Sequence, residues 1–265
     1  MGTRNDTGDV EPKPLDTLAA FEEGDFHALG ERLGRDAQYN DRRLVTRRKL
    51  GAVAKSALDG LVADAKASGR ELDLVQRTSL HQPHVFNHMR VRRMWAYLCR
   101  GKKEKTRLRG VIGADLAKDL DAAYRNAYLC VAIEEEALEV SLRIHPDAWF
   151  DGQNLVHRVR KEGPALLVAL LNPLAGFRLK LDDWKGEWIC GKLTTDSMRD
   201  FFKYYKPGEL GLSLERRWPA PAGARGPVLA PDVPAQLVAE LRALAAPYRY
   251  AAWSQESDFL FESKL

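Results

Sequence analysis

Residues 128–144 constrain the fold most strongly, because a hydrophobic segment is followed there by one in which hydrophobic and polar side chains alternate. In 138–144 (LEVSLRI) every second residue is aliphatic, and the residues between them are polar or charged. Such alternation is typical of a β-strand with one buried face. The segment 128–133 (YLCVAI) precedes it across the short acidic turn 134–136. The two segments therefore predict a half-buried antiparallel hairpin.

Helical periodicity dominates the first quarter of the chain. Apolar residues recur every three or four positions between 41 and 68, which predicts a long amphipathic helix that ends at Gly69. A shorter helical stretch is expected at 15–34. We therefore expect an α-helical N-terminal region at 15–70. The polar segment 1–14 before it has no apolar anchor and is predicted to be a disordered leader.

The rest of the chain, 71–265, is predicted to be one α+β domain with a Pro/Gly/Ala-rich loop at 218–234. The fold class is thus α+β: antiparallel β-hairpins packed with helices and preceded by the helical N-terminal region. Neither a GxGxxG nor a P-loop motif occurs, which argues against a doubly wound nucleotide-binding fold. Further strands are expected at 72–80, 94–100, 177–181 and 187–193, a basic loop at 100–109, and helices at 113–124, 147–160, 164–171, 194–205 and 234–244.

Composition narrows the class of protein. The chain has 265 residues, of which 45% are hydrophobic and 29% are charged, as in ordinary soluble globular proteins. The three cysteines Cys99, Cys130 and Cys190 form no CxxC pair, which argues against a zinc ribbon and a disulfide framework. The longest apolar run, 165–171, is far shorter than the ~20 residues that span a bilayer. Since no signal peptide is visible, we expect a cytoplasmic protein without a membrane partner and without a cofactor or metal.

The segment 90–109 (RVRRMWAYLCRGKKEKTRLR) concentrates positive charge. It holds nine basic residues, and Glu104 is its one acidic residue. Local positive potential attracts polyanions, so the segment predicts binding of nucleic acid or another polyanion. A second basic group at 42–49 lies on the long predicted helix, where a solvated helix face is the alternative. The predicted phosphate-binding residues are Arg42, Arg43, Arg47, Arg90, Arg92, Arg93, Arg100, Lys102, Lys103, Lys105, Arg107 and Arg109.

Two aromatic residues, Trp95 and Tyr97, lie inside the basic segment. On a strand they share one face, since side chains alternate across a strand. They are included in the predicted interface because aromatic rings on a sheet can stack with the bases of a single strand. The alternative is that both rings are buried in the core while the basic loop remains solvated.

The leading prediction is a cytoplasmic accessory protein that binds nucleic acid or another polyanion and catalyses no reaction. One alternative is a metal-dependent nuclease or phosphodiesterase, although the acid–x–Lys motif of restriction-type nucleases is absent. Another is a protein-interaction or assembly module with a protein partner, in which the segment 184–188 (WKGEW) lies at an interface. The residues that the nuclease would use are drawn from Glu139, Asp147, Asp151, His81, His84 and His88.

Overall fold

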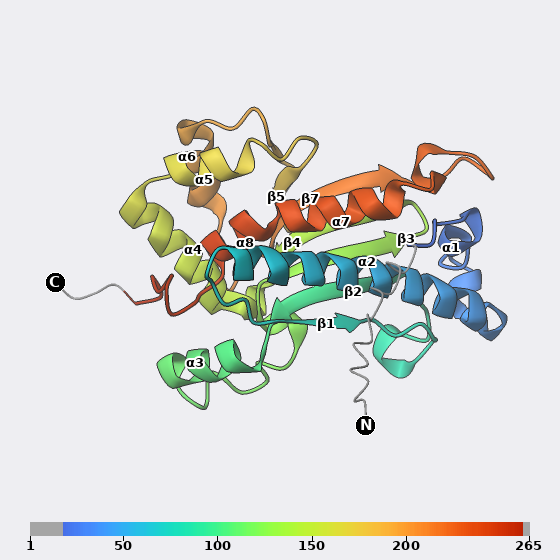
Figure 1. The fold of residues 1–265 in the computed structure, drawn as a ribbon, viewed down its shortest axis with the longest axis horizontal. Helices are drawn as coiled ribbons and strands as arrows, with labels where there is room; N and C mark the ends of the chain where they lie inside the picture. The colour runs from blue at the N-terminus through green and yellow to red at the C-terminus, as the bar shows by residue number, and fades with distance from the viewer. Residues whose placement is uncertain (1–17, 262–265) are drawn as a thin grey trace, which may run out of the picture.

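The structure of the chain is a computed structural model that describes residues 18–261. Its centre is a seven-stranded sheet with the strand order β1-β2-β3-β4-β7-β5-β6, in which all neighbours are antiparallel (Figure 1). This arrangement confirms the predicted α+β class. The strands are β1 (Leu74–Thr78), β2 (Arg93–Arg100), β3 (Tyr128–Glu134), β4 (Ala137–Ile144), β5 (Arg178–Leu181), β6 (Trp188–Ile189) and β7 (Leu212–Pro219).

The hairpin predicted from alternation is confirmed as β3 and β4. Val131 lies opposite Val140, and Ala132 lies opposite Glu139. The leucine, valine and isoleucine residues of both strands point to one face and are buried there in the hydrophobic core. Burying one such side chain contributes about 1.5–3 kcal/mol, so this face anchors the sheet.

Helices cover that apolar face of the sheet. The long helix α2 (Asn40–Ala67) packs against β1, β2 and β3, and α7 (Val233–Ala243) packs against β3 and β4. Figure 1 shows α2 and α7 side by side in front of the sheet. Core side chains of α2 and of the strands belong to the same hydrophobic cluster, so the N-terminal region and the sheet share one core. Further helices are α4 (Trp149–Glu162), α5 (Ala165–Leu171), α6 (Thr195–Tyr204) and α8 (Ala245–Ala251).

The predicted basic loop at 100–109 is wrong, because most of it forms the helix α3 (Lys102–Ile112). Lysine and arginine are good helix formers, and their charge alone does not indicate a loop. The side chain of Leu108 is fully buried beneath the helix. The carboxylate of Asp73 accepts a hydrogen bond from the backbone N–H of Glu104 at 2.9 Å and so satisfies the first turn.

Other boundaries also differ from the sequence-based expectation. The predicted helix at 113–124 is wrong: the chain makes turns there, followed by a 3-10 turn at Ala123–Arg125. Gly113 ends α3 with a φ of 87°, a conformation that glycine adopts easily. The stretch 15–34 forms the short helix α1 (Glu23–His27) and a 3-10 turn in its described part. The predicted leader 1–14 lies outside the described residues.

Candidate nucleic-acid interface

The two faces of β2 differ in character. Met94, Ala96 and Leu98 point into the core beneath α2 and are fully buried. Trp95 and Tyr97 point to the opposite face and are partly buried. We call this opposite face, which lies away from α2 and α7, the open face. The structure therefore places both aromatic rings outside the hydrophobic core.

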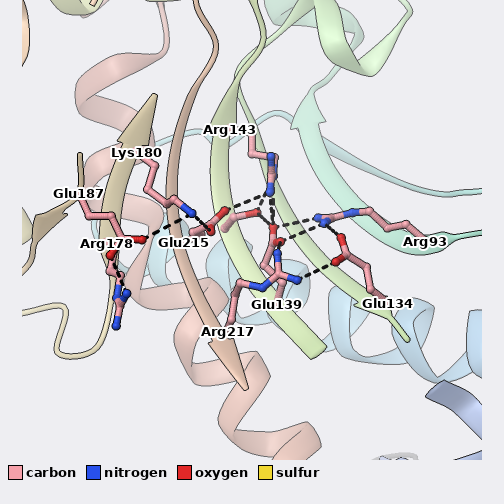
Figure 2. Close-up of polar contacts among 10 residues, drawn as sticks. Arg93, Glu134, Glu139, Arg143, Arg178, Lys180, Glu187, Glu215 and Arg217 are labelled. Carbon is pink, nitrogen blue, oxygen red and sulfur yellow. Dashed lines mark hydrogen bonds and ion pairs between the residues drawn. The ribbon is translucent and has the colours of Figure 1, made fainter. Parts of the chain in front are cut away.

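The centre of the open face is a network of ion pairs around Glu139 on β4 (Figure 2). Its carboxylate accepts hydrogen bonds from Arg93 and Arg143, each at 2.8 Å, and from the hydroxyl of Ser141 at 2.7 Å. Burial alone raises the pKa of Glu139, but the bonds and charges of the two arginines outweigh it. The net result is a pKa well below the ordinary value of 4.5, so this carboxylate is ionised at neutral pH.

The network extends across neighbouring strands. Glu215 on β7 accepts from Arg143 at 3.2 Å and from Lys180 on β5 at 3.4 Å. Arg217 on β7 donates to Glu134 at 2.6 Å. Positive and negative charges nearly balance, so the centre of the open face exerts little net attraction on a polyanion. The cations of the network are Arg93, Arg143, Arg178, Lys180 and Arg217, and its carboxylates are Glu134, Glu139, Glu187 and Glu215.

The edge of the open face, over β1 and β2, has a different charge balance. Arg77 on β1 lies opposite Tyr97 in the strand register, and its side chain is exposed. Lys105 of α3 donates to Asp121 at 3.1 Å. This hydrogen bond lowers the pKa of Asp121, and the charges of Arg77 and Arg109 lower it further. Lys105 therefore contacts the Asp121 carboxylate directly, and the charges of Arg77 and Arg109 also act on it.

The charges of two of these cations, Lys105 and Arg77, also act on the open face of β2. Burial raises the pKa of the Cys99 thiol, and the charges of Lys105 and Arg77 oppose that rise. Cys99 follows Trp95 and Tyr97 on the same face of the strand. Cations and aromatic rings are thus adjacent at this edge of the sheet. We call the set Arg77, Trp95, Tyr97, Lys105 and Arg109 the basic–aromatic strip.

Three of the residues predicted to bind phosphate are buried: Arg43, Arg100 and Lys105, of which Lys105 is 7% exposed. Arg43 has no exposed surface, and it donates to the backbone carbonyls of Ala28 at 3.1 Å and Leu33 at 2.8 Å. It thereby fixes the chain that precedes α2. Arg100 is 2% exposed and forms an ion pair with Asp151 at 2.8 Å. In this fold both guanidinium groups are occupied by protein partners.

The basic segment 90–109 is also divided in space. Arg93 and Arg100 lie at opposite ends of β2, seven steps apart along the strand, which corresponds to ~23 Å. Within the described part of the chain, Arg92, Lys102 and Arg109 are exposed and form no ion pair. The predicted residues with acidic partners are Arg42 (Glu22, Asp25), Arg90 (Glu31), Arg93 (Glu134, Glu139), Arg100 (Asp151), Lys103 (Glu71), Lys105 (Asp121) and Arg107 (Glu104, Glu71), whereas Arg47 donates to Thr78.

Arg77 is the strip residue that the sequence did not reveal. It is separated from the basic segment by more than ten positions. A single arginine in a predicted strand does not by itself indicate a binding site. The sequence feature that could have indicated Arg77 is its position within the predicted strand 72–80, which can pair with the strand that carries Tyr97. Antiparallel pairing of β1 with β2 then brings Arg77 next to Tyr97.

The residues proposed for a metal nuclease do not come together. Glu139 belongs to the network on the open face, whereas Asp151 pairs with Arg100 at the far end of β2. The ring of His84 stacks on Phe86 with centroids 4.9 Å apart. Among residues 18–261 no group of three or more His, Cys, Asp or Glu side chains is arranged to hold a metal ion.

The sequence matches no protein-family model and no curated protein. An α+β fold by itself does not define a function, since similar architectures host many unrelated activities. Within the described residues no helix combines the length and the apolar composition needed to cross a bilayer. Function must therefore be inferred from the side chains that the fold brings together.

Proposed function

We propose that the protein binds single-stranded nucleic acid through the basic–aromatic strip and catalyses no reaction on it. The observation that supports this proposal is the position of Arg77 opposite Tyr97, on the same open face as Trp95. Lys105 and Arg109 add positive charge, because they act together with Arg77 on the carboxylate of Asp121. Cations bind the phosphates of a strand, and aromatic rings stack with its bases in a sequence-tolerant way.

The geometry of β2 suits an extended strand of nucleotides. Trp95 and Tyr97 are two residues apart on one face, which corresponds to ~7 Å along the strand. Both rings are partly exposed, so a base can approach each of them without displacing the core. Arg77 lies beside Tyr97, where it can contact the phosphate next to a stacked base.

The first test is fluorescence anisotropy with a labelled single-stranded DNA or RNA of mixed sequence, titrated between about 50 and about 300 mM salt. We expect the logarithm of the binding constant to fall linearly with the logarithm of salt concentration. Each phosphate contact with a single strand contributes about −0.7 to this slope. Binding that does not depend on salt would contradict the proposal.

Variants locate the site. Arg77→Glu/Arg109→Glu should reduce affinity and make the slope shallower by about 1.4, because two phosphate contacts are lost. Tyr97→Leu should cost about 1–3 kcal/mol of binding free energy, since one stacked base loses its ring. The matched control is Arg160→Glu/Lys192→Glu, which makes the same change of charge in two exposed residues outside the strip. Equal losses in both double variants would show that net charge, and not the strip, controls binding.

The same experiment distinguishes a binder from a nuclease. A labelled strand that stays intact in the presence of magnesium or manganese agrees with the proposal. Cleavage that a chelator abolishes would instead support the metal-dependent nuclease and overturn the non-catalytic function.

A further inference from the structure

A large cavity lies at the end of the sheet where β1 begins and β2 ends. Its volume is about 740 Å³, within the range of about 300–1,000 Å³ that is usual for small-molecule sites. The chain after α2, the first turns of α3 and the helices α4, α5 and α8 line it, together with residues 253–257 near the C-terminus. In Figure 1 this is the end of the sheet near α8 and α4. The basic–aromatic strip contributes no residue to the lining.

A buried arginine lines this cavity. Arg100 donates to Asp151 at 2.8 Å, to the backbone carbonyl of Trp253 at 2.7 Å and to Asn126 at 3.1 Å. A guanidinium group has five N–H donors, so these three bonds do not exhaust its capacity. The neighbouring Tyr248 is 6% exposed and also lines the cavity, and its hydroxyl makes no hydrogen bond among residues 18–261. The cavity wall therefore holds donors that a ligand can use.

The rim of the cavity carries further positive charge. Arg70 and Arg249 both line the cavity, both are exposed, and neither forms an ion pair within the described chain. Most of the acidic residues that line the cavity already have hydrogen-bond or ion-pair partners within the protein. Glu71 pairs with Lys103, and the Asp73 carboxylate accepts a hydrogen bond from the first turn of α3. The charged groups of the cavity that remain available to a ligand are thus mainly positive.

We propose that this cavity binds a small molecule of nucleotide size that carries an anionic group, a phosphate or a carboxylate, on an apolar or aromatic body. The anionic group lies between Arg70 and Arg249 and reaches toward Arg100 and Tyr248. The apolar body packs against the leucines of α5 that line the same cavity, Leu166 and Leu170. Arginine is suited to both anions, because its planar N–H groups bind phosphate and carboxylate oxygens in pairs.

The test is calorimetric titration of the full chain with four probes: adenosine 5′-monophosphate, phenyl phosphate, benzoate and uncharged adenosine. We expect at least one anionic probe to bind with a dissociation constant below about 1 mM, and adenosine to bind more weakly. The first two probes report a phosphate site and benzoate reports a carboxylate site. If no anionic probe binds at about 10 mM, the proposal is overturned.

Variants separate this site from the nucleic-acid interface. Arg70→Glu/Arg249→Glu should weaken binding of the anionic probe at least about tenfold, since two attractive charges become repulsive. Tyr248→Phe removes one hydroxyl, keeps the ring and should also weaken the probe. Arg77→Glu/Arg109→Glu, with the same change of charge on the strip, should leave probe affinity unchanged. Equal probe affinity in the wild type and in Arg70→Glu/Arg249→Glu would refute the site even if nucleic acid binds as proposed.

Discussion

Replacing Glu139 by glutamine tests whether the network on the open face stabilises the fold. The substitution keeps the shape of the side chain and removes the charge shared by Arg93 and Arg143. Breaking a fully buried ion pair costs about 3–5 kcal/mol. Here the two arginines are 24% and 26% exposed, and each has a second carboxylate partner, so solvent and that partner compensate in part. We therefore expect a loss of about 2–3 kcal/mol in the free energy of unfolding at pH 7.

The pH dependence provides an independent check. The folded protein holds the pKa of Glu139 well below its ordinary value of 4.5. A group of this kind contributes stability above its unfolded pKa and loses that contribution as the pH falls toward the folded pKa. The stability difference between the wild type and Glu139→Gln should thus be complete at pH 7 and should shrink below about pH 4.5.

Urea unfolding followed by circular dichroism at several pH values measures both effects. Glu136→Gln is the matched control, because Glu136 lies exposed in the turn between β3 and β4 and should change stability by less than about 0.5 kcal/mol. The reasoning is refuted if Glu139→Gln is as stable as the wild type at pH 7. It is equally refuted if the difference grows as the pH falls.

Two further predictions concern local packing and the thiols. Gly101→Ala should destabilise the protein by about 0.5–2 kcal/mol in urea unfolding, because the new Cβ would clash with Asp73 Oδ1 and displace the carboxylate that satisfies the start of α3. Gly110→Ala, which adds a Cβ in open space on the same helix, should instead stabilise it by about 0.5–1 kcal/mol. The buried cysteines should react slowly with a disulfide reagent at pH 8 and rapidly after unfolding, because burial raises the pKa of Cys130 to about 11 and that of Cys190 to about 12. Fast labelling of the native protein would contradict the burial of these thiols.

Parts of the fold were predictable because sequence period and burial coincide. The alternation in 138–144 predicted β4 because every second side chain packs under the helices and the others face away from them. The periodicity in 41–68 predicted α2 to within one residue at each end, since one side of this helix packs on the sheet. In both elements the local sequence pattern agrees with the tertiary packing, so the sequence alone was sufficient to predict them.

The candidate interface was predictable only in part, because charge density along the chain differs from charge density in space. The basic segment 90–109 appears continuous in the sequence, but a strand separates Arg93 from Arg100 by ~23 Å. Acidic partners such as Glu31 and Asp151 are distant in the sequence from the arginines that they pair with, so the local sequence could not predict these ion pairs. The sequence suggested Trp95 as a candidate interface residue, whereas Arg77 became a candidate only from the register of β1 and β2.

The balanced charge at the centre of the open face has a consequence for binding. An antiparallel sheet with helices on one side needs polar residues on the other, and here the long stems of Arg93 and Arg143 accompany a nearly inaccessible Glu139. A polyanion that approached this centre would have to compete with the carboxylates already bound there. The edge offers the cations of the basic–aromatic strip beside Asp121, and that carboxylate is itself exposed to solvent. We therefore expect Glu139→Gln to extend nucleic-acid binding toward the centre of the sheet, so that its affinity rises while its stability falls.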